Sequence, residues 1–198
     1  MSNFSISSLS LGLLILIFVQ SCILPKANHL EPDFYLLNLP SLEGNATSSD
    51  QAPVFYIREI ELPQYLRDNR MVYRPSMESV EFREYKRWGE PIANGIARVL
   101  GDNLAQKLGS LTYSVYPNRR KNQCNFEIAI SIKSFEKHRD QMTVLDASIE
   151  VKTGDGRILR ETFKTQTKMV TPKEIDEVRA LSDCLSKLAD RLHSLISA

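Results

Sequence analysis

Few side chains of this 198-residue chain have types and spacings that could carry out chemistry. Its three histidines, His29, His138 and His193, are far apart, and none is spaced with another ligand type as zinc sites require. The sequence has no G-x-S-x-G nucleophile elbow, no H-E-x-x-H pair, no Walker loop and no Rossmann glycine pattern. Carboxylates are plentiful, but an acid–base pair cannot be chosen from them without a fold. The residues therefore favour a binding or structural protein over an enzyme.

Cys22 is the residue whose surroundings do indicate a reaction. It follows an uncharged leader with an apolar core at 9–19. A core of about 10 residues suits a secretory signal peptide, whereas a membrane span needs roughly 20 residues. The junction Val19-Gln20-Ser21-Cys22 resembles the lipobox of bacterial lipoproteins, in which the cysteine receives a diacylglycerol, the leader is cleaved and the new N-terminus is acylated. We therefore expect a signal peptide at 1–21 and a covalent N-acyl and S-diacylglycerol lipid on Cys22. The alternative is an uncleaved anchor helix over 4–24.

Two further cysteines, Cys124 and Cys184, remain once Cys22 is assigned to the lipid. The envelope outside the inner membrane is oxidising, so a disulfide between them is permitted. A bridge needs Cα atoms closer than ~7 Å, which the sequence does not reveal, and two buried free thiols are the alternative. No C-x-x-C motif and no Cys/His group at metal spacing is present, so we expect no metal and no cofactor beyond the lipid.

The charge balance argues against nucleic acid as a partner. The 25 Lys and Arg residues nearly cancel the 24 Asp and Glu residues, for a formal net charge of +1. Binding to phosphates needs a clear basic excess. With 42% hydrophobic residues the chain can build one packed domain. We place a lipidated tether at 22–32 and this domain at 33–198.

The domain begins with short strand candidates and then gives a clear β pattern. Alternating apolar and polar residues at 126–133 and 145–151 predict two strands with one face on a core. The segment Gly154-Asp155-Gly156 predicts a tight turn into a third strand, and the polar stretch 41–51 predicts a loop. The expected strands are 34–39, 54–62, 71–74, 79–85, 113–116, 126–133, 145–151 and 157–168.

Apolar residues at three- and four-residue steps predict two long amphipathic helices, at about 89–108 and 172–196. Pro91 would lie in the first turn of the first helix, and glycines at 95 and 101 inside it would allow close approach to a sheet. Thr171 and Glu174 would cap the second helix reciprocally. The leucine seam of that helix lasts under three heptads, and it packs either on its own sheet or on another chain. We expect an α+β fold: a single domain with a mixed, mostly antiparallel sheet packed against the two helices.

Four segments of the first half of the chain occur in the order typical of a known family. They are 60–66 (I-E-L-P-Q-Y-L), 71–74 (M-V-Y-R), 84–92 (E-Y-K-R-W-G-E-P-I) and 96–104 (I-A-R-V-L-G-D-N-L). They resemble the V-x-L-P-x-Y-L, I-V-Y-R, R-W-A-E-P-L and R-V-L-x-x-N-L motifs of the PqiC/YmbA family, the ABC-type transport auxiliary lipoprotein component. An early Y-x-L strand is matched at 34–37. The resemblance spans nearly the whole mature chain.

This resemblance implies a non-catalytic lipoprotein at the outer membrane of a Gram-negative bacterium, facing the periplasm. Its partners would be an MCE-domain protein and an inner-membrane transporter component, and it would form a homo-oligomer. It would dock the MCE assembly of an intermembrane lipid transport system at the outer membrane. A periplasmic lipid- or solute-binding lipoprotein is the main alternative, and an envelope hydrolase is the weakest one.

Five residues match the family motifs most closely: Leu62, Pro63, Tyr65, Trp88 and Pro91. Their roles are open at this point. They are either architectural, as strand-ending and helix-opening residues, or include exposed aromatic anchors, Tyr65 and Trp88, at a subunit or MCE interface. Trp88→Ala distinguishes these alternatives, because loss of a core tryptophan lowers stability whereas loss of an interface tryptophan abolishes assembly and leaves folding intact.

Overall fold

The computed structural model describes residues 30–38, 52–110, 113–118 and 124–197. The chain divides into two compact units, Met1–Glu31 and Pro32–Ala198, and every helix and strand that the structure describes lies in the second. Cys22, the leader and the predicted loop at 41–51 lie outside the described residues. The elements are β1 (Asp33–Tyr35), β2 (Phe55–Ile57), η2 (Gln64–Leu66), β3 (Arg70–Ser76), β4 (Ser79–Trp88), α2 (Ile92–Lys107), β5 (Tyr113–Val115), β6 (Phe126–His138), η3 (Arg139–Gln141), β7 (Met142–Thr153), β8 (Ile158–Lys168) and α3 (Glu174–Ser197).

The strands of the described part form one eight-stranded mixed sheet that branches at β6. One path runs β1-β4-β3-β6-β2-β5, and a second leaves β6 through β7 to β8. The antiparallel pairs β6–β7 and β7–β8 make the longest ladders, whereas β1–β4, β2–β5, β2–β6 and β3–β6 are short parallel pairs. The predicted α+β class is confirmed.

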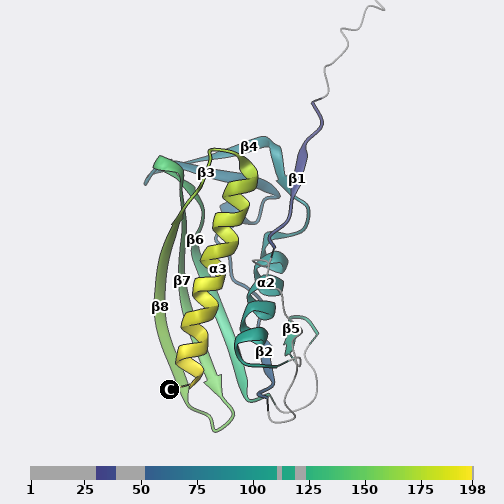
Figure 1. Ribbon diagram of the computed structural model, residues 1–198, viewed down its shortest axis with the longest axis vertical. Coiled ribbons are helices and arrows are strands. Elements are labelled where there is room, and N and C mark those ends of the chain that lie inside the picture. Colours follow the sequence, from purple (N-terminus) through teal and green to yellow (C-terminus); the bar gives the residue numbers. More distant parts are fainter. Residues whose placement is uncertain (1–29, 39–51, 111–112, 119–123, 198) are drawn as a thin grey trace, which may run out of the picture. The chain divides into compact units, whose positions relative to one another are not determined.

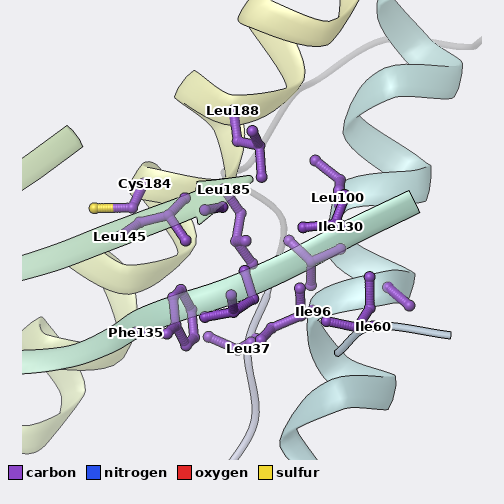
Figure 2. Packing of buried hydrophobic residues seen from close by; sticks show 14 of the residues in the cluster. Leu37, Ile60, Ile96, Leu100, Ile130, Phe135, Leu145, Cys184, Leu185 and Leu188 are labelled. Atoms are coloured by element: carbon purple, nitrogen blue, oxygen red, sulfur yellow. The ribbon is translucent and has the colours of Figure 1, made fainter. Parts of the chain in front are cut away.

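Both helices lie on one face of the sheet (Figure 1). The alternating isoleucines of β6 point to this face because successive strand residues face opposite sides, and Ile130 is 1% exposed. Around Ile130, Figure 2 shows Leu100 of α2 on one side and Leu185 of α3 on the other. The seam residues of α3 are buried from Val178 to Leu192. The seam therefore packs on the protein's own core, which was one of the two alternatives.

Several strand boundaries differ from the sequence prediction. β1 ends at Tyr35 and β2 ends at Ile57, so both are shorter than the stretches 34–39 and 54–62. The chain stays beside β6 after Ile57. Arg58 N–H donates to Ile128 O (2.9 Å) and Glu61 N–H donates to Ile130 O (3.0 Å), so three residues of this segment span two residues of β6. An extra residue of this kind interrupts regular pairing.

Both helices begin later than predicted. Pro91 is the N-cap of α2 and not part of its first turn, and Trp88 is the last residue of β4 rather than a helical residue. Thr171 accepts a hydrogen bond from the Lys173 N–H (3.3 Å) and donates to the Asp176 carboxylate. Its side-chain partner in α3 is thus Asp176, and the expected reciprocal cap with Glu174 is wrong.

Gly101 of α2 makes the close approach to the sheet that its position suggested. A Cβ added at Gly101 would lie 2.4 Å from Tyr113 Cε2, and the Tyr113 ring is stacked on Phe55 with centroids 5.1 Å apart. We expect Gly101→Ala to lower the free energy of unfolding by about 1–3 kcal/mol, because overpacking outweighs a propensity gain of about 1 kcal/mol. Denaturant titration measures this change.

Gly95 of the same helix provides the matched control. A Cβ there would lie 3.1 Å from Glu90 Oε1, the end of a flexible side chain that can move away. Gly95→Ala should therefore be neutral or slightly stabilising. Equal stability of the two alanine variants would contradict the close approach at Gly101.

Candidate functional site

The two cysteines of the described domain lie at opposite ends of the β6–β7 ladder. Cys184 of α3 is fully buried, with its Sγ 3.4 Å from Thr167 Oγ1 and 3.7 Å from Thr143 Oγ1. Cys124 stands just before Phe126, which is in register with Thr153. At about 3.3 Å per residue, the strand from Thr143 to Thr153 separates these ends by roughly 30 Å. Both cysteines are free, so the hypothesis of a disulfide is wrong.

The two thiols should react very differently. Burial raises the pKa of the Cys184 thiol, and its sulfur is shielded by the core, whereas Cys124 is partly exposed. We expect iodoacetamide to modify Cys124 in the native protein and Cys184 only after unfolding, because the exposed thiolate is the reactive species. Intact-mass and peptide mass spectrometry measure the two sites. Modification of Cys184 at the same rate as Cys124 would contradict the packing of α3.

The first family motif forms a short bend beneath the sheet. Pro63 is the N-cap of η2, and Leu62 and Leu66 are buried on either side of it. Arg67 Nε donates to the Leu62 carbonyl (3.1 Å) and closes this bend. Tyr65 is half-buried, and its ring lies under the Arg74 guanidinium, 5.2 Å from the ring centroid. Pro63 and Leu62 are thus structural in this fold, while Tyr65 points to a polar network.

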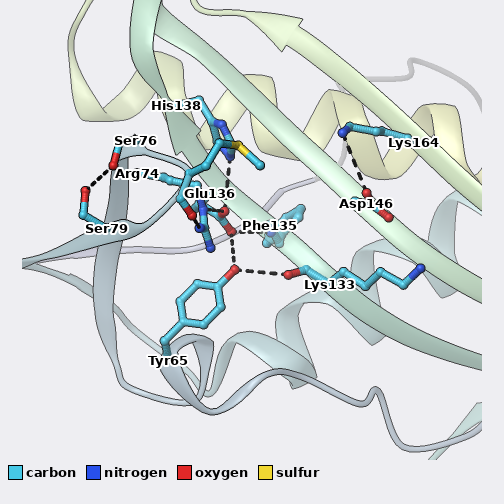
Figure 3. A network of polar contacts seen from close by, with 11 residues as sticks. Tyr65, Arg74, Ser76, Ser79, Lys133, Phe135, Glu136, His138, Asp146 and Lys164 are labelled. Atoms are coloured by element: carbon cyan, nitrogen blue, oxygen red, sulfur yellow. Dashed lines mark hydrogen bonds and ion pairs between the residues drawn. The ribbon is translucent and has the colours of Figure 1, made fainter.

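That network is centred on Glu136 of β6, which is 1% exposed (Figure 3). Its carboxylate accepts hydrogen bonds from Arg74 Nε (2.7 Å), from the Tyr65 hydroxyl (3.0 Å) and from the Phe135 N–H (2.6 Å). His138 Nε2 lies 3.2 Å away. Burial and the neighbouring Glu136 carboxylate raise the pKa of Tyr65. Two family motifs, 60–66 and 71–74, are therefore joined through a buried carboxylate that the sequence analysis missed.

The third and fourth motifs meet at the corner between β4 and α2. The Trp88 side chain is buried. The backbone N–H of Trp88 donates to the Asn69 carbonyl (2.7 Å), and the backbone N–H of Gly89 donates to the Tyr35 carbonyl (2.8 Å). Glu90 then pairs with Arg98 of α2 (2.7 Å). Of the two alternatives for Trp88, the structure favours the architectural one, since an exposed interface anchor would not be buried.

A second buried acid, Glu177 of α3, also escaped the sequence analysis. It is 1% exposed and pairs with Arg83 of β4, and burial raises the pKa of the Glu177 carboxyl. Within the described residues, Arg83 Nε and Glu177 Oε2 have no hydrogen-bond partner. A glutamate next to the buried leucines of α3 could have indicated a buried acid. The helix sequence alone does not reveal that Arg83 of β4 is the partner of this glutamate.

The face of the sheet away from α2 and α3 carries a hollow of about 530 Å³. Its floor is made of small side chains, Ala129, Ser131 and Ser148, which point away from the helices because their neighbours in β6 and β7 are core residues. Charged residues form the rim: Arg58, Glu61, Glu150 and Arg160. Arg160 and Glu150 form an ion pair across β7 and β8 (2.8 Å). The hollow is the candidate interaction site of this domain.

Two further kinds of site, a metal centre and a membrane-spanning helix, would leave recognisable features in the part of the chain that the structure describes. No group of three or more His, Cys, Asp or Glu side chains there is placed to hold a metal ion. Among the same residues, no helix has the length and apolar character needed to span a membrane.

Comparison with known proteins identifies one matching family model and several solved structures of similar fold. The family model described as ABC-type transport auxiliary lipoprotein component matches residues 35–193. One solved structure, described as an uncharacterized protein, superposes with a TM-score of 0.71 at 16% identity, covering 84% of this chain and 99% of that one. A Xanthomonas campestris protein assigned to DUF330 superposes with a TM-score of 0.62 at 11% identity, covering 81% and 92%. Among curated proteins, none matches the chain significantly.

Proposed function

The chain belongs to the family of ABC-type transport auxiliary lipoprotein components, and from this premise we propose that it is the outer-membrane docking subunit of an MCE-type intermembrane lipid transport system. It is held in the membrane by the lipid on Cys22 and acts as a homo-oligomer without catalysing a reaction. Its partners are an MCE-domain protein and an inner-membrane transporter component. The observation that carries this proposal is the family match over 35–193 behind a lipobox cysteine.

The described residues support a docking role in two ways. Most of the family motif residues build the fold, through Glu136, Trp88 and the Glu90–Arg98 pair, whereas Glu61 of the first motif lines the hollow. The hollow on that face has a charged rim and a floor of small side chains, which can accept side chains of a partner protein.

Affinity purification of the mature, lipidated protein from its native envelope tests the proposal. We expect mass spectrometry of the eluate to identify an MCE-domain protein in stoichiometric yield, and native mass spectrometry of the bait to give an oligomer. A monomer that brings no such partner would contradict the docking role. Intact mass of the bait reports separately whether Cys22 is acylated.

A bulky residue in the hollow should abolish co-purification of the partner. Ser148→Trp fills the hollow from β7 on the face away from the core, so the fold should be retained while the amount of bound MCE-domain protein falls at least about tenfold. Gln166→Trp is the matched control, because Gln166 is exposed on the neighbouring strand β8 and does not line the hollow. Unchanged partner recovery with Ser148→Trp would place docking elsewhere.

A lipid-binding role is the second candidate, and one observation favours it. A hollow of about 630 Å³ opens near the β7–β8 turn and the end of α3, with Phe126, Leu159, Leu195 and Ile196 among its lining residues. An apolar ligand could enter there, although the space between helices and sheet is filled by the core. Solvent extraction of the purified protein, followed by mass spectrometry, tests this role. A stoichiometric lipid besides the one on Cys22 would favour it.

A further inference from the structure

The two most exposed large hydrophobic side chains of the described residues lie in neighbouring turns. Val170, between β8 and α3, is 89% exposed, and Met77, in the turn between β3 and β4, is 78% exposed. Ile175, in the first turn of α3, is 46% exposed. We call these three side chains the apolar tip. Each lies in a turn or at a helix end, and the described helices and strands leave a large part of it exposed.

Strand register and backbone hydrogen bonds bring these turns together. At this end of the sheet β3, β6, β7 and β8 lie side by side, with Tyr73 opposite Lys137, Lys137 opposite Thr143, and Thr143 opposite Thr167. Met169 N–H, next to Val170, donates to Gln141 O of η3 (2.8 Å), and β3 also contacts η3. Figure 1 shows the β3–β4 turn, the β6–β7 turn and the start of α3 at the upper end of the domain.

The chain enters the domain near the start of α3, which carries Ile175 of the apolar tip. Lys86 Nζ lies 2.6 Å from Asp33, the first residue of β1, and 4.0 Å from Glu174, the first residue of α3 and the neighbour of Ile175. Cys22 precedes Asp33 by a stretch that spans at most about 40 Å when fully extended. An acylated Cys22 therefore holds Asp33, where the chain enters the domain, within about 40 Å of a bilayer.

The charges around the tip suit a phospholipid surface. Arg139, Lys168 and Lys173 are exposed in the same turns, and none forms an ion pair within the described residues. Glu78, Glu81 and Asp140 are exposed carboxylates at this end, whereas the three cations lie in the segments next to Val170. Lys and Arg next to apolar side chains favour the headgroup region of membranes that contain anionic lipid.

We propose that the apolar tip rests on the bilayer that holds the lipid anchor, with Val170 and Met77 inserted at the boundary of headgroups and acyl chains. This inference rests on the acylation of Cys22 in the proposed function. Separate aliphatic side chains on protruding turns suit a fluid apolar layer, whereas protein interfaces are centred on packed aromatic residues and Arg. The tip then orients the domain, so that the β7–β8 turn and the end of α3 point away from the membrane.

Fluorescence quenching by brominated lipids tests this orientation. The full chain is expressed in its native host, purified in lipidated form and placed in vesicles of phosphatidylethanolamine and phosphatidylglycerol with brominated acyl chains. We expect strong quenching of the added fluorescence in Val170→Trp and in Met77→Trp. Ile158→Trp is the matched control, since Ile158 is 45% exposed at the opposite end of the sheet, and it should not be quenched. The single native tryptophan, Trp88, is buried and contributes equally to all variants.

The outcomes separate the tip from the anchor. Acylated protein that floats with vesicles and shows no difference between Val170→Trp and Ile158→Trp overturns the tip proposal and leaves the anchor in place. If the protein lacks the acyl mass but Val170→Trp is still quenched selectively, acylation of Cys22 is wrong and membrane contact of the apolar tip is supported. If the acyl mass and the selective quenching are both absent, both proposals are wrong. If the emission of Val170→Trp changes with protein concentration but not with vesicles, the apolar tip contacts a second copy of the chain. This outcome overturns the proposal.

Discussion

Trp88→Ala should lower the free energy of unfolding by about 3–5 kcal/mol, which is the usual cost of removing a large aromatic side chain from a core. Trp88 is 8% exposed and belongs to the main hydrophobic cluster. It ends β4, stands in register with Tyr35 of β1, and is followed within three residues by the N-cap of α2. Its ring therefore fills the corner where the sheet passes into the first helix, and the gap left by alanine cannot close without moving both.

Tyr85→Ala is the matched control for this prediction. Tyr85 is an aromatic residue of the same strand but is 46% exposed, so its loss should change stability by about 1 kcal/mol or less. Denaturant titration gives both values, and co-purification of the partner is measured on the same proteins. A Trp88→Ala protein that keeps its stability and loses its partner would identify Trp88 as an interface anchor and overturn its core role.

The elements that were predictable from the sequence are those with long, regular periods. The apolar face of α2 and the leucine seam of α3 repeat over several turns, and the alternation of β6 and β7 continues over many residues, so each pattern identifies its element almost alone. Their ends were less predictable. Pro91 fits a first helical turn as well as an N-cap, and only the path of the chain from Trp88 decides between them.

The short parallel strands and the polar network were not predictable for a physical reason. β2 has three residues, and its pairing with both β5 and β6 joins segments far apart in sequence. Glu136 lies beyond the expected end of β6, past a bulge between Ile132 and Ser134 that changes which face each residue occupies. Its burial depends on Tyr65 and Arg74 covering it, and no local pattern encodes a contact across more than sixty residues.

The motif residues of the family are explained by this fold to a large extent. Tyr65 and Arg74 meet on Glu136, Trp88 fills the corner before α2, and Pro63 begins η2. Motif residues that serve to build the fold give little information about which protein the domain binds. The contact surfaces that we propose are instead the hollow on the sheet face, for a partner protein, and the apolar tip, for the bilayer.

Glu136→Ala should be as damaging as the loss of Trp88, at about 3–5 kcal/mol, because it breaks a buried ion pair from one side. Arg74 is only 16% exposed in its side chain, and without Glu136 its charge would have to remain there with no carboxylate beside it. The Tyr65 hydroxyl would also lose one acceptor, though the Lys133 carbonyl lies 3.2 Å away. The cost thus comes mainly from the stranded guanidinium and not from the hydrogen bonds that are lost.

A double-mutant cycle distinguishes this account from a simple loss of volume. If the stranded charge dominates, Arg74→Met in the Glu136→Leu background should restore much of the lost stability, since replacing both members of a buried pair by apolar residues is often neutral. Tyr65→Phe, which removes a single hydroxyl, should cost only about 1 kcal/mol. Additive losses from Arg74→Met and Glu136→Leu would mean that the two side chains contribute separately. Segments 60–66 and 71–74 would then be held against β6 by their apolar residues, and the Arg74–Glu136 ion pair would not be what joins them.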